Sequence, residues 1–288
     1  MEHNEKNKLE KSTLYLVGTP IGNLSDLSER AKKVLSEVDF IAAEDTRNSM
    51  KLCSVLGIKK EFVSYFEHNK KASGERIVAR LLDGESCALV TDAGMPAVSD
   101  PGEDIVRLCA EAGITVSVIP GPCAAVSALA LSALSTARFT FEGFLPVQKS
   151  DRRKRLGSLA KEERTMIFYE APHKLSATLS DMLETFGGKR KISLCRELTK
   201  LNEEVIRTTL EGALNLYLEK EPRGEYVLII EGALEAGVDI DGENPLLSLS
   251  PTEHIEHYIN DGYSKMDAIK AAAKDRKISK SEMYKLVL

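Results

Sequence analysis

The sequence lacks several features that would assign it to a familiar class of protein. It has no pair of cysteines spaced as CxxC, and no stretch approaches the roughly 20 apolar residues of a membrane span. Its cysteines are widely spaced and odd in number, which argues against a disulfide framework. They are Cys53, Cys87, Cys109, Cys123 and Cys195. The first dozen residues are polar without a signal-peptide core, so we expect a cytoplasmic protein whose residues 1–12 are disordered.

An excess of charge of one sign is also missing. Lys and Arg number 39 against 44 Asp and Glu, which gives a formal net charge of -5. This balance gives no global reason to expect a polyanionic partner, so any nucleic-acid contact must come from local basic patches. The 288 residues suffice for two domains of about 100 to 200 residues and a small appendage.

Several motifs for cofactors and nucleophiles are absent as well. No GxxxxGK[ST] segment occurs, and the glycines at 18 and 22 do not space as GxGxxG, so dinucleotides are disfavoured. There is no GxSxG elbow, and Cys123 is more simply a small residue at a helix start than a nucleophile. His254 and His257 form a lone i, i+3 pair, so we expect no catalytic metal.

The most informative stretch that is present is TDAGMPAVSDPG at 91–102, which suits neither a helix nor a strand. The apolar run at 87–90 predicts a buried strand before it, and 103–112 predicts a helix after it that ends at Gly113. Loops of this kind lie at the carboxyl ends of parallel strands, where ligands bind. Its two glycines and two prolines let the backbone approach a ligand closely and hold it stiffly. A tight turn without a ligand is the alternative for this loop alone.

The same change from strand to polar loop recurs along the first half of the chain. Such a βα repeat predicts a mostly parallel sheet covered on both faces, with all the loops along one edge. Five loops at one edge favour a ligand-binding crevice over unrelated turns. The predicted strands are 14–17, 40–43, 62–65, 87–90 and 115–119.

A change of composition near residue 136 predicts further parts. The aromatic segment 139–144 begins a second α/β region with strands of more mixed direction, and 236–252 has the composition of a linker. Beyond it, short helices separated by turns resemble a helix-turn-helix, with a solvated helical cap as the alternative. The predicted parts are an N-terminal α/β domain at 13–123, a connecting helix at 124–136, a second α/β domain at 137–235, the linker, and a helical module at 253–288.

Two basic segments favour contact with RNA. One follows the aromatic segment, and RNA contacts use such combinations of basic and aromatic groups. The other lies in the C-terminal module, where basic residues outnumber acidic ones after residue 262. A solvated face is the more usual reading of a charge run and stays open. The candidates for RNA contact are Arg152, Arg153, Lys154, Arg155, Lys274 and Lys277.

The loops also carry motifs by which the sequence resembles the tetrapyrrole methylase superfamily. The resemblance runs from about residue 13 to the C-terminus, and the motifs follow in the order of that family. They are GTPIGN at 18–23, AEDTR at 43–47, TDAGMP at 91–96, SDPG at 99–102, PGP at 120–122 and YEAPHK at 169–174.

The resemblance implies a two-domain α/β enzyme that binds S-adenosylmethionine between its domains, usually as a homodimer. The branch of the family that it resembles methylates the ribose 2'-hydroxyl of a cytidine in the decoding centre of 16S ribosomal RNA, within small-subunit RNA or the assembled small ribosomal subunit. Relatives more often have serine at position 123, so a backbone contact there would survive in this chain and a hydroxyl contact would not. By motif, the cofactor would contact Gly94, Met95, Val98, Gly121, Cys123, Ala124, Tyr169 and Glu170.

Transfer of a methyl group to a ribose hydroxyl requires alignment of the reactants and loss of a proton. We expect Asp45 or Glu44, in the polar loop 44–49, to be the general base, with Arg47 orienting a carboxylate or gripping a phosphate. Glu197 and Lys200 are second choices. The alternative is that Glu44, Asp45 and Arg47 form a structural cap and an ion-pair cluster.

Two other functions stay open on the sequence. The first is a methyltransferase of the same fold that acts on a tetrapyrrole or another small molecule, which would not need the basic run or the helical module. The second is a non-catalytic protein that binds RNA or the ribosome on a methylase scaffold. It would not bind S-adenosylmethionine tightly, although the loops look intact.

Overall fold

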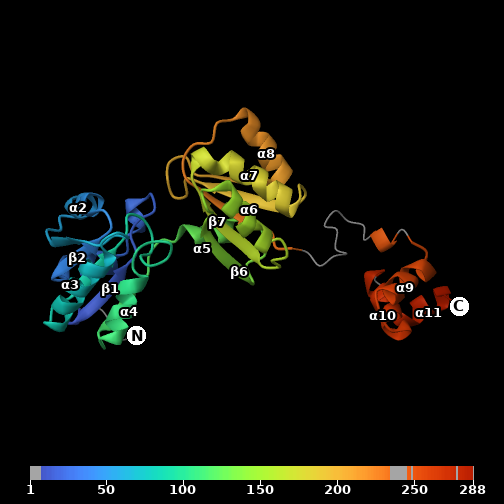
Figure 1. Ribbon diagram of the computed structural model, residues 1–288, viewed down its shortest axis with the longest axis horizontal. Helices are drawn as coiled ribbons and strands as arrows, with labels where there is room; N and C mark the ends of the chain where they lie inside the picture. Colours follow the sequence, from blue (N-terminus) through green and yellow to red (C-terminus); the bar gives the residue numbers. More distant parts are fainter. Residues whose placement is uncertain (1–7, 234–244, 248, 277, 288) are drawn as a thin grey trace. The chain divides into compact units, whose positions relative to one another are not determined.

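The computed structural model describes residues 8–233, 245–247, 249–276 and 278–287 (Figure 1). The chain divides into two compact units, Met1–Gly232 and Ala233–Leu288. Parts of the predicted disordered N-terminus and of the predicted linker, residues 1–7 and 236–244, lie outside the described residues, as does Lys277. Both predicted α/β domains belong to the first unit, so their separation into two folding domains stays a prediction.

The first sheet of this unit has five strands in the order β3-β2-β4-β1-β5, and every neighbouring pair is parallel. The mostly parallel sheet that the βα repeat predicts is therefore confirmed, and each strand begins within one residue of its predicted start. The strands are β1 (Thr13–Val17), β2 (Phe40–Ala43), β3 (Glu61–Ser64), β4 (Cys87–Val90) and β5 (Thr115–Ile119).

Helices cover both faces of this sheet because successive strand residues point to opposite sides. In β1, Leu14 belongs to one buried cluster, whereas Tyr15 and Val17 belong to the other. Most of the covering helices follow directly from a strand and its loop. They are α1 (Glu29–Glu37), α2 (Thr46–Val55), α3 (Lys70–Leu82) and α4 (Glu103–Glu111), and a short 3-10 helix, η1 (Leu24–Asp26), precedes α1.

The start of α2 corrects one prediction. The polar run 44–49 is predicted as a loop, but the helix already begins at Thr46. The reason is the side chain of Asp45, which accepts a hydrogen bond from the backbone N–H of Arg47 at 2.9 Å and so caps the first turn. The loop between β2 and α2 is consequently short.

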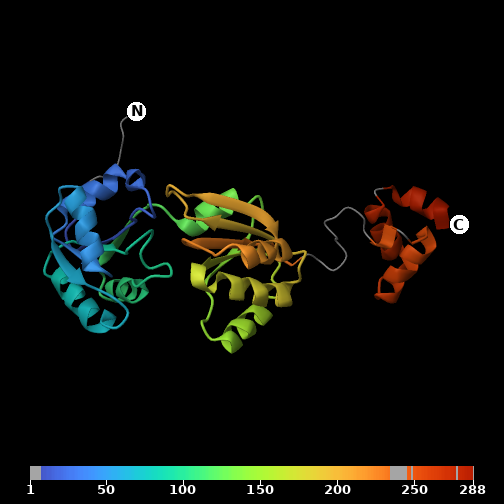
Figure 2. The same cartoon turned by 90° about the horizontal axis from the view of Figure 1, so that it is seen from above.

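The second sheet also has five strands, in the order β6-β7-β10-β8-β9. Only β6 and β7 pair in parallel and the other pairs are antiparallel, which confirms the predicted mixed direction. Helix α5 (Ala124–Leu131) packs on one face of this sheet, and the other helices of this part of the chain pack on the opposite face (Figure 2). The elements are β6 (Phe139–Phe144), α6 (Lys149–Ser158), β7 (Thr165–Glu170), α7 (Pro172–Phe186), β8 (Lys191–Arg196), β9 (Glu204–Thr209), α8 (Leu210–Glu219) and β10 (Tyr226–Ile230).

The described residues of the second unit form a short 3-10 helix and three α-helices, and the α-helices share a small core. Ser250 and Glu253 form a capping box at the start of α9, and Ile269 and Met283 join α10 and α11 to the same cluster. None of the helices in the described part of the chain is long and apolar enough to cross a membrane. The elements are η2 (Pro245–Leu247), α9 (Pro251–Asn260), α10 (Lys265–Asp275) and α11 (Lys280–Val287).

Candidate active site

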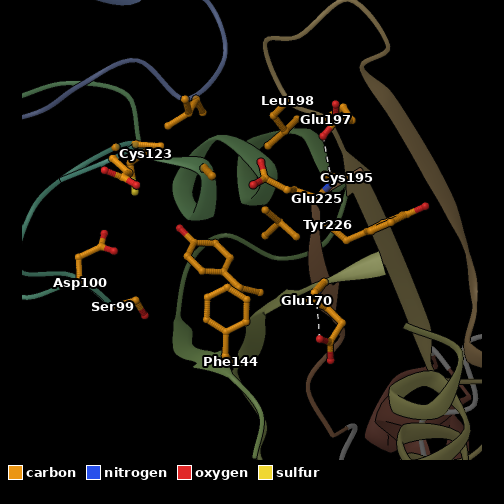
Figure 3. A pocket seen from close by; sticks show the side chains of 18 of the residues that line it. Ser99, Asp100, Cys123, Phe144, Glu170, Cys195, Glu197, Leu198, Glu225 and Tyr226 are labelled. Atoms are coloured by element: carbon orange, nitrogen blue, oxygen red, sulfur yellow. Dashed lines mark hydrogen bonds between the residues drawn. The ribbon is translucent and has the colours of Figure 1, made fainter. Parts of the chain in front are cut away.

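The first unit contains a cavity of about 520 Å³ where loops of the first sheet meet strands and loops of the second (Figure 3). Ile21 after β1, the segment 91–100 after β4, and Cys123 and Ala124 after β5 line it from the first sheet. From the second sheet, the ends of β7, β8 and β10 contribute. Three of the five loops that the sequence predicts at one edge therefore line this cavity.

Close backbone packing holds these loops together and explains two of the motif glycines. A Cβ atom on Gly18 would lie 2.6 Å from Cα of Gly121, and one on Gly121 would lie 2.8 Å from Cα of Gly18. The loop after β4 is joined to the loop after β1 by two hydrogen bonds between the backbones of Thr19 and Gly94, at 2.9 and 3.1 Å. The wall of the cavity is thus built from backbone that side chains at these positions would displace.

Seven of the eight residues predicted to contact the cofactor come together at the cavity, and their role in binding stays a prediction. Gly121 is not among the residues that line the cavity, because it packs against Gly18. The residues that do line it are Gly94, Met95, Val98, Cys123, Ala124, Tyr169 and Glu170.

The two predicted contacts from β7 differ in environment. The ring of Tyr169 packs edge-on against Phe141 and Phe144, with ring centroids 5.2 and 5.5 Å apart, and burial raises the pKa of its phenol to about 12. Glu170 is 5% exposed, and its carboxylate accepts hydrogen bonds from the Thr178 hydroxyl at 2.6 Å and the Ala171 N–H at 2.9 Å. Tyr169 therefore presents a protonated, aromatic wall, whereas Glu170 anchors the start of α7.

The predicted catalytic residues lie outside the lining of the cavity. Arg47 grips Asp45 with both arms of its guanidinium group, Nε to Oδ1 at 3.0 Å and Nη2 to Oδ2 at 2.8 Å. These hydrogen bonds lower the pKa of Asp45 to about 2, which makes it a weak base. Glu44 is closer to the cavity, since its Oε2 accepts a hydrogen bond at 3.1 Å from the hydroxyl of the lining residue Thr91. The contacts between Asp45 and Arg47 are the structural cap and the ion pair that the alternative interpretation expects. The catalytic role of Glu44, Asp45 and Arg47 stays a prediction.

The second choices for the base, Glu197 and Lys200, both line the cavity and are joined in one ion-pair cluster. Lys200 Nζ contacts Glu197 Oε1 at 2.9 Å and Glu225 Oε2 at 2.7 Å. The backbone N–H of Glu225 also donates to Glu197, and this bond and Lys200 lower the pKa of Glu197. Glu197 is accordingly held as a carboxylate that is already engaged.

The sequence interpretation missed Asp100, a partly buried carboxyl group on the cavity wall. Its burial, with repulsion from Glu44 and Asp92, raises its pKa to about 6, against the opposing hydrogen bond of Thr91. A carboxyl group inside a Gly/Pro loop is the signal that could have drawn attention to it. Thr91 and Asp92 belong to the same loop, but Glu44 follows β2, and its approach to Asp100 could not be identified from the sequence.

The basic run on α6 is mostly engaged within the fold. Arg152 is 7% exposed, and its Nε and Nη2 both lie 2.7 Å from Oδ2 of Asp181. Arg153 pairs with the same aspartate at 2.8 Å, and Arg155 pairs with Glu142. The burial of Arg152 argues against its predicted contact with RNA, because a buried side chain offers no surface. Lys154 and Lys274 are exposed.

Within the described residues, no group of three or more His, Cys, Asp or Glu side chains could hold a metal ion. The cavity instead fits a flat, cationic organic cofactor. Its volume lies in the range of about 300 to 1,000 Å³ usual for ligand pockets, Phe144 and Tyr169 provide apolar ring surface, and Asp92 and Asp100 provide negative charge.

Comparison with known proteins shows the family to which the chain belongs. The family described as Tetrapyrrole (Corrin/Porphyrin) Methylases matches residues 13–214, which is more than half of the chain. The chain belongs to the tetrapyrrole methylase family. Members of this family use S-adenosylmethionine as methyl donor, so the protein is a methyltransferase that uses this cofactor.

Curated relatives are similar over nearly the whole chain. The chain is 48% identical to the ribosomal RNA small subunit methyltransferase I of Halalkalibacterium halodurans, over 96% of this chain and 95% of that protein. It is 47% identical to the protein of the same name from Bacillus subtilis, over 96% of this chain and 94% of that protein. Within the family, it is thus most usefully compared with proteins of that name.

Solved structures share the fold at low identity. A diphthine synthase aligns with a TM-score of 0.59 and 15% identity, over 76% of this chain and 90% of that one. A cobalt precorrin-4 methyltransferase aligns with a TM-score of 0.57 and 16% identity, over 76% of this chain and 95% of that one. The two-sheet architecture is therefore that of this methyltransferase fold.

Proposed function

We propose that the protein transfers the methyl group of S-adenosylmethionine to the ribose 2'-hydroxyl of a cytidine in the decoding centre of 16S ribosomal RNA. The observation that carries the proposal is the similarity over 96% of the chain to proteins named ribosomal RNA small subunit methyltransferase I. The choice of cytidine and of the 2'-hydroxyl rests on the motif resemblance.

The cavity supplies the means to hold the cofactor, which brings an electrophilic methyl group when bound. In our proposal, Gly94, Cys123 and Ala124 contact it through the backbone, because their own side chains are small or absent. Met95, Val98 and Tyr169 provide apolar surface, and Glu170 holds the start of α7 in place. Alignment of this kind contributes up to roughly 7 to 11 kcal/mol in favourable cases.

In this proposal, the residues at the start of α2 help to bind the RNA beside the cavity. Asp45 fixes the guanidinium group of Arg47, which is 81% exposed and available to an RNA phosphate. Glu44 holds the side chain of Thr91, which lines the cavity, by accepting a hydrogen bond from its hydroxyl. Replacing Arg47 with Ala should therefore raise the KM for RNA and leave cofactor affinity unchanged, and a purely structural cap would change neither.

Further contact with the RNA is proposed for the second unit. Tyr263 and Tyr284 are 50% and 40% exposed on it, and exposed aromatic rings beside basic groups suit RNA bases and phosphates. The exposed lysines that accompany them include Lys274, and on α6 Lys154 is placed for the same purpose. The predicted contact by Lys277 lies outside the described residues.

We also propose that the protein acts as a homodimer in the cytoplasm, where the small subunit is assembled. Exposed apolar side chains on α5 and β6, including Val126, Leu131 and Phe139, support an interface between copies. Sedimentation at micromolar concentration tests the dimer, and a monomer at every concentration would refute it.

The function is tested by transfer of labelled methyl groups from S-adenosylmethionine to small ribosomal subunits that lack their native modifications. Naked 16S RNA and a tetrapyrrole are offered in parallel, because the family description names corrin and porphyrin methylases. We expect label in a cytidine whose 3' linkage resists alkaline cleavage. Label only in the tetrapyrrole would support a small-molecule enzyme, and binding of RNA without any transfer would support a non-catalytic protein.

A further inference from the structure

Asp100 is a cavity-lining carboxyl group to which the motif resemblance assigns no role. Figure 3 shows its side chain between Ser99 and Cys123, on one side of the cavity. It belongs to the loop after β4, the same loop that carries Gly94 and Met95. A substrate that reaches the cofactor has to enter the space that this carboxyl group borders.

The backbone holds Asp100 in place by an unusual conformation. Ala97 and Ser99 have φ angles of 66° and 62°, a region that non-glycine residues rarely occupy. Gly102 packs so closely on Ala97 that a Cβ atom there would lie 2.7 Å from Ala97 Cβ. Backbone strain of this kind persists where surrounding structure fixes it, and it concentrates at functional sites.

The hydroxyl of Thr91 joins Asp100 to Glu44. It donates to Glu44 Oε2 at 3.1 Å, and it also lies close enough to Asp100 to act on that carboxyl group and lower its pKa. Because a hydroxyl has one proton, it can donate to only one of the two carboxyl groups at a time, and its lone pairs can accept from the other. The three side chains therefore form a chain along which a proton can pass from the cavity towards Glu44.

The groups that face Asp100 make it a suitable base near neutral pH. Burial and the carboxylates of Glu44 and Asp92 together raise its pKa to about 6, against the opposing effect of Thr91. From β7, the phenol of Tyr169 also faces it. A base is most effective when its pKa lies near the working pH, whereas Asp45, with a pKa of about 2, is too weak.

We propose that Asp100 is the general base of the methyl transfer, an inference that rests on the proposed transfer to a ribose hydroxyl. The carboxylate takes the hydroxyl proton as the new oxygen–carbon bond forms and the carbon–sulfur bond breaks, with its electron pair left on sulfur. The proton then passes from Asp100 to the Thr91 oxygen while Thr91 gives its own proton to Glu44, which releases it to solvent. Glu44 and Thr91 are positioning residues in this scheme.

The test compares single-turnover methylation of undermethylated small subunits by the wild type and by Asp100→Asn. We expect the rate to fall by about 100- to 10,000-fold, with the affinity for S-adenosylhomocysteine in calorimetry unchanged within about twofold. Asp104→Asn is the matched control, because this carboxylate lies on α4 outside the cavity and pairs with Lys70 and Arg107. Its rate should equal that of the wild type.

The pH dependence separates a base from a structural residue. The wild-type rate should rise with pH up to about 6 and level off above it, since the base must be deprotonated, and this step should disappear in Asp100→Asn. Full activity of Asp100→Asn, an unchanged pH step, or a loss explained by weaker cofactor binding would each overturn the inference. A wild type that transfers no methyl group to the subunit would instead refute the proposed function, and this role with it.

Discussion

Replacement of Asp100 by asparagine is expected to stabilise the folded protein above pH 6 and to leave its stability unchanged near pH 3.5. The carboxyl group has an ordinary pKa of 3.8 and a folded-state pKa of about 6, so the folded state holds the proton more tightly than the unfolded state. The stability from this preference is complete below pH 3.8 and is lost as the pH rises to about 6. Asparagine is neutral at every pH, so the variant does not lose this stability as the pH rises.

The magnitude follows from the difference between the two pKa values. At about 1.4 kcal/mol for each unit of pKa, the difference between 3.8 and about 6 corresponds to a loss of about 3 kcal/mol in the free energy of unfolding above pH 6. Solvent reaches part of the side chain, so we expect about 1 to 3 kcal/mol in practice. An enzyme that keeps such a carboxyl group in its cavity accepts lower stability for a base of suitable strength.

The assay is urea unfolding of the wild type and Asp100→Asn at pH 4 and pH 7.5, without cofactor. Asp104→Asn is again the control, with the opposite sign, because Lys70 and Arg107 lower the pKa of Asp104. The contribution of Asp104 is present above its unfolded pKa, so its loss should destabilise the protein at pH 7.5 and have less effect at pH 4. A free-energy difference between Asp100→Asn and the wild type that is the same at both pH values would contradict the assigned environment.

Three further predictions concern other parts of the chain. Gly18→Ala should abolish cofactor binding measured by calorimetry, because the added Cβ would collide with the Gly121 backbone. Gly157→Ala is the control and should bind the cofactor normally, because a Cβ at that position has no neighbouring atom within 4 Å. His254 accepts a hydrogen bond from Arg276, and burial lowers the pKa of its imidazole, so the folded second unit favours the neutral ring. As the pH falls below 6.5, protonation of His254 should destabilise this unit and reduce the helical circular dichroism signal. An unchanged signal would refute this. Removal of 233–288 should weaken RNA binding and reduce its salt dependence without changing cofactor affinity, and equal RNA affinity would exclude the unit from the interface.

The fold was predictable where local pattern decides the structure. The strand at 87–90 is an apolar run because central parallel strands are buried on both faces, and the loop after it is visible from its glycines and prolines. The order of the strands in the second sheet was not predictable, because β10 pairs with β7 and β8 across long sequence separations. The early start of α2 was missed because the cap depends on one hydrogen bond that the Asp45 side chain accepts from the backbone N–H of Arg47.

The candidate site was predictable in outline and not in its chemistry. The motif loops that line the cavity could be identified one by one, but the charge state of Asp100 depends on Glu44 and Thr91, which follow different strands. The burial of Arg152 depends on Asp181 on another helix, so a basic run that reads as a surface proved to be partly interior. Properties that arise from contacts between distant segments require the folded structure.

The most direct measurement is nucleoside mass spectrometry of 16S ribosomal RNA from cells in which the gene is deleted and then restored. We expect one 2'-O-methylated cytidine in the decoding centre to disappear on deletion, to return with the wild-type gene, and to stay absent with Asp100→Asn expressed at the same level. An unchanged set of methylated nucleosides after deletion would contradict the account.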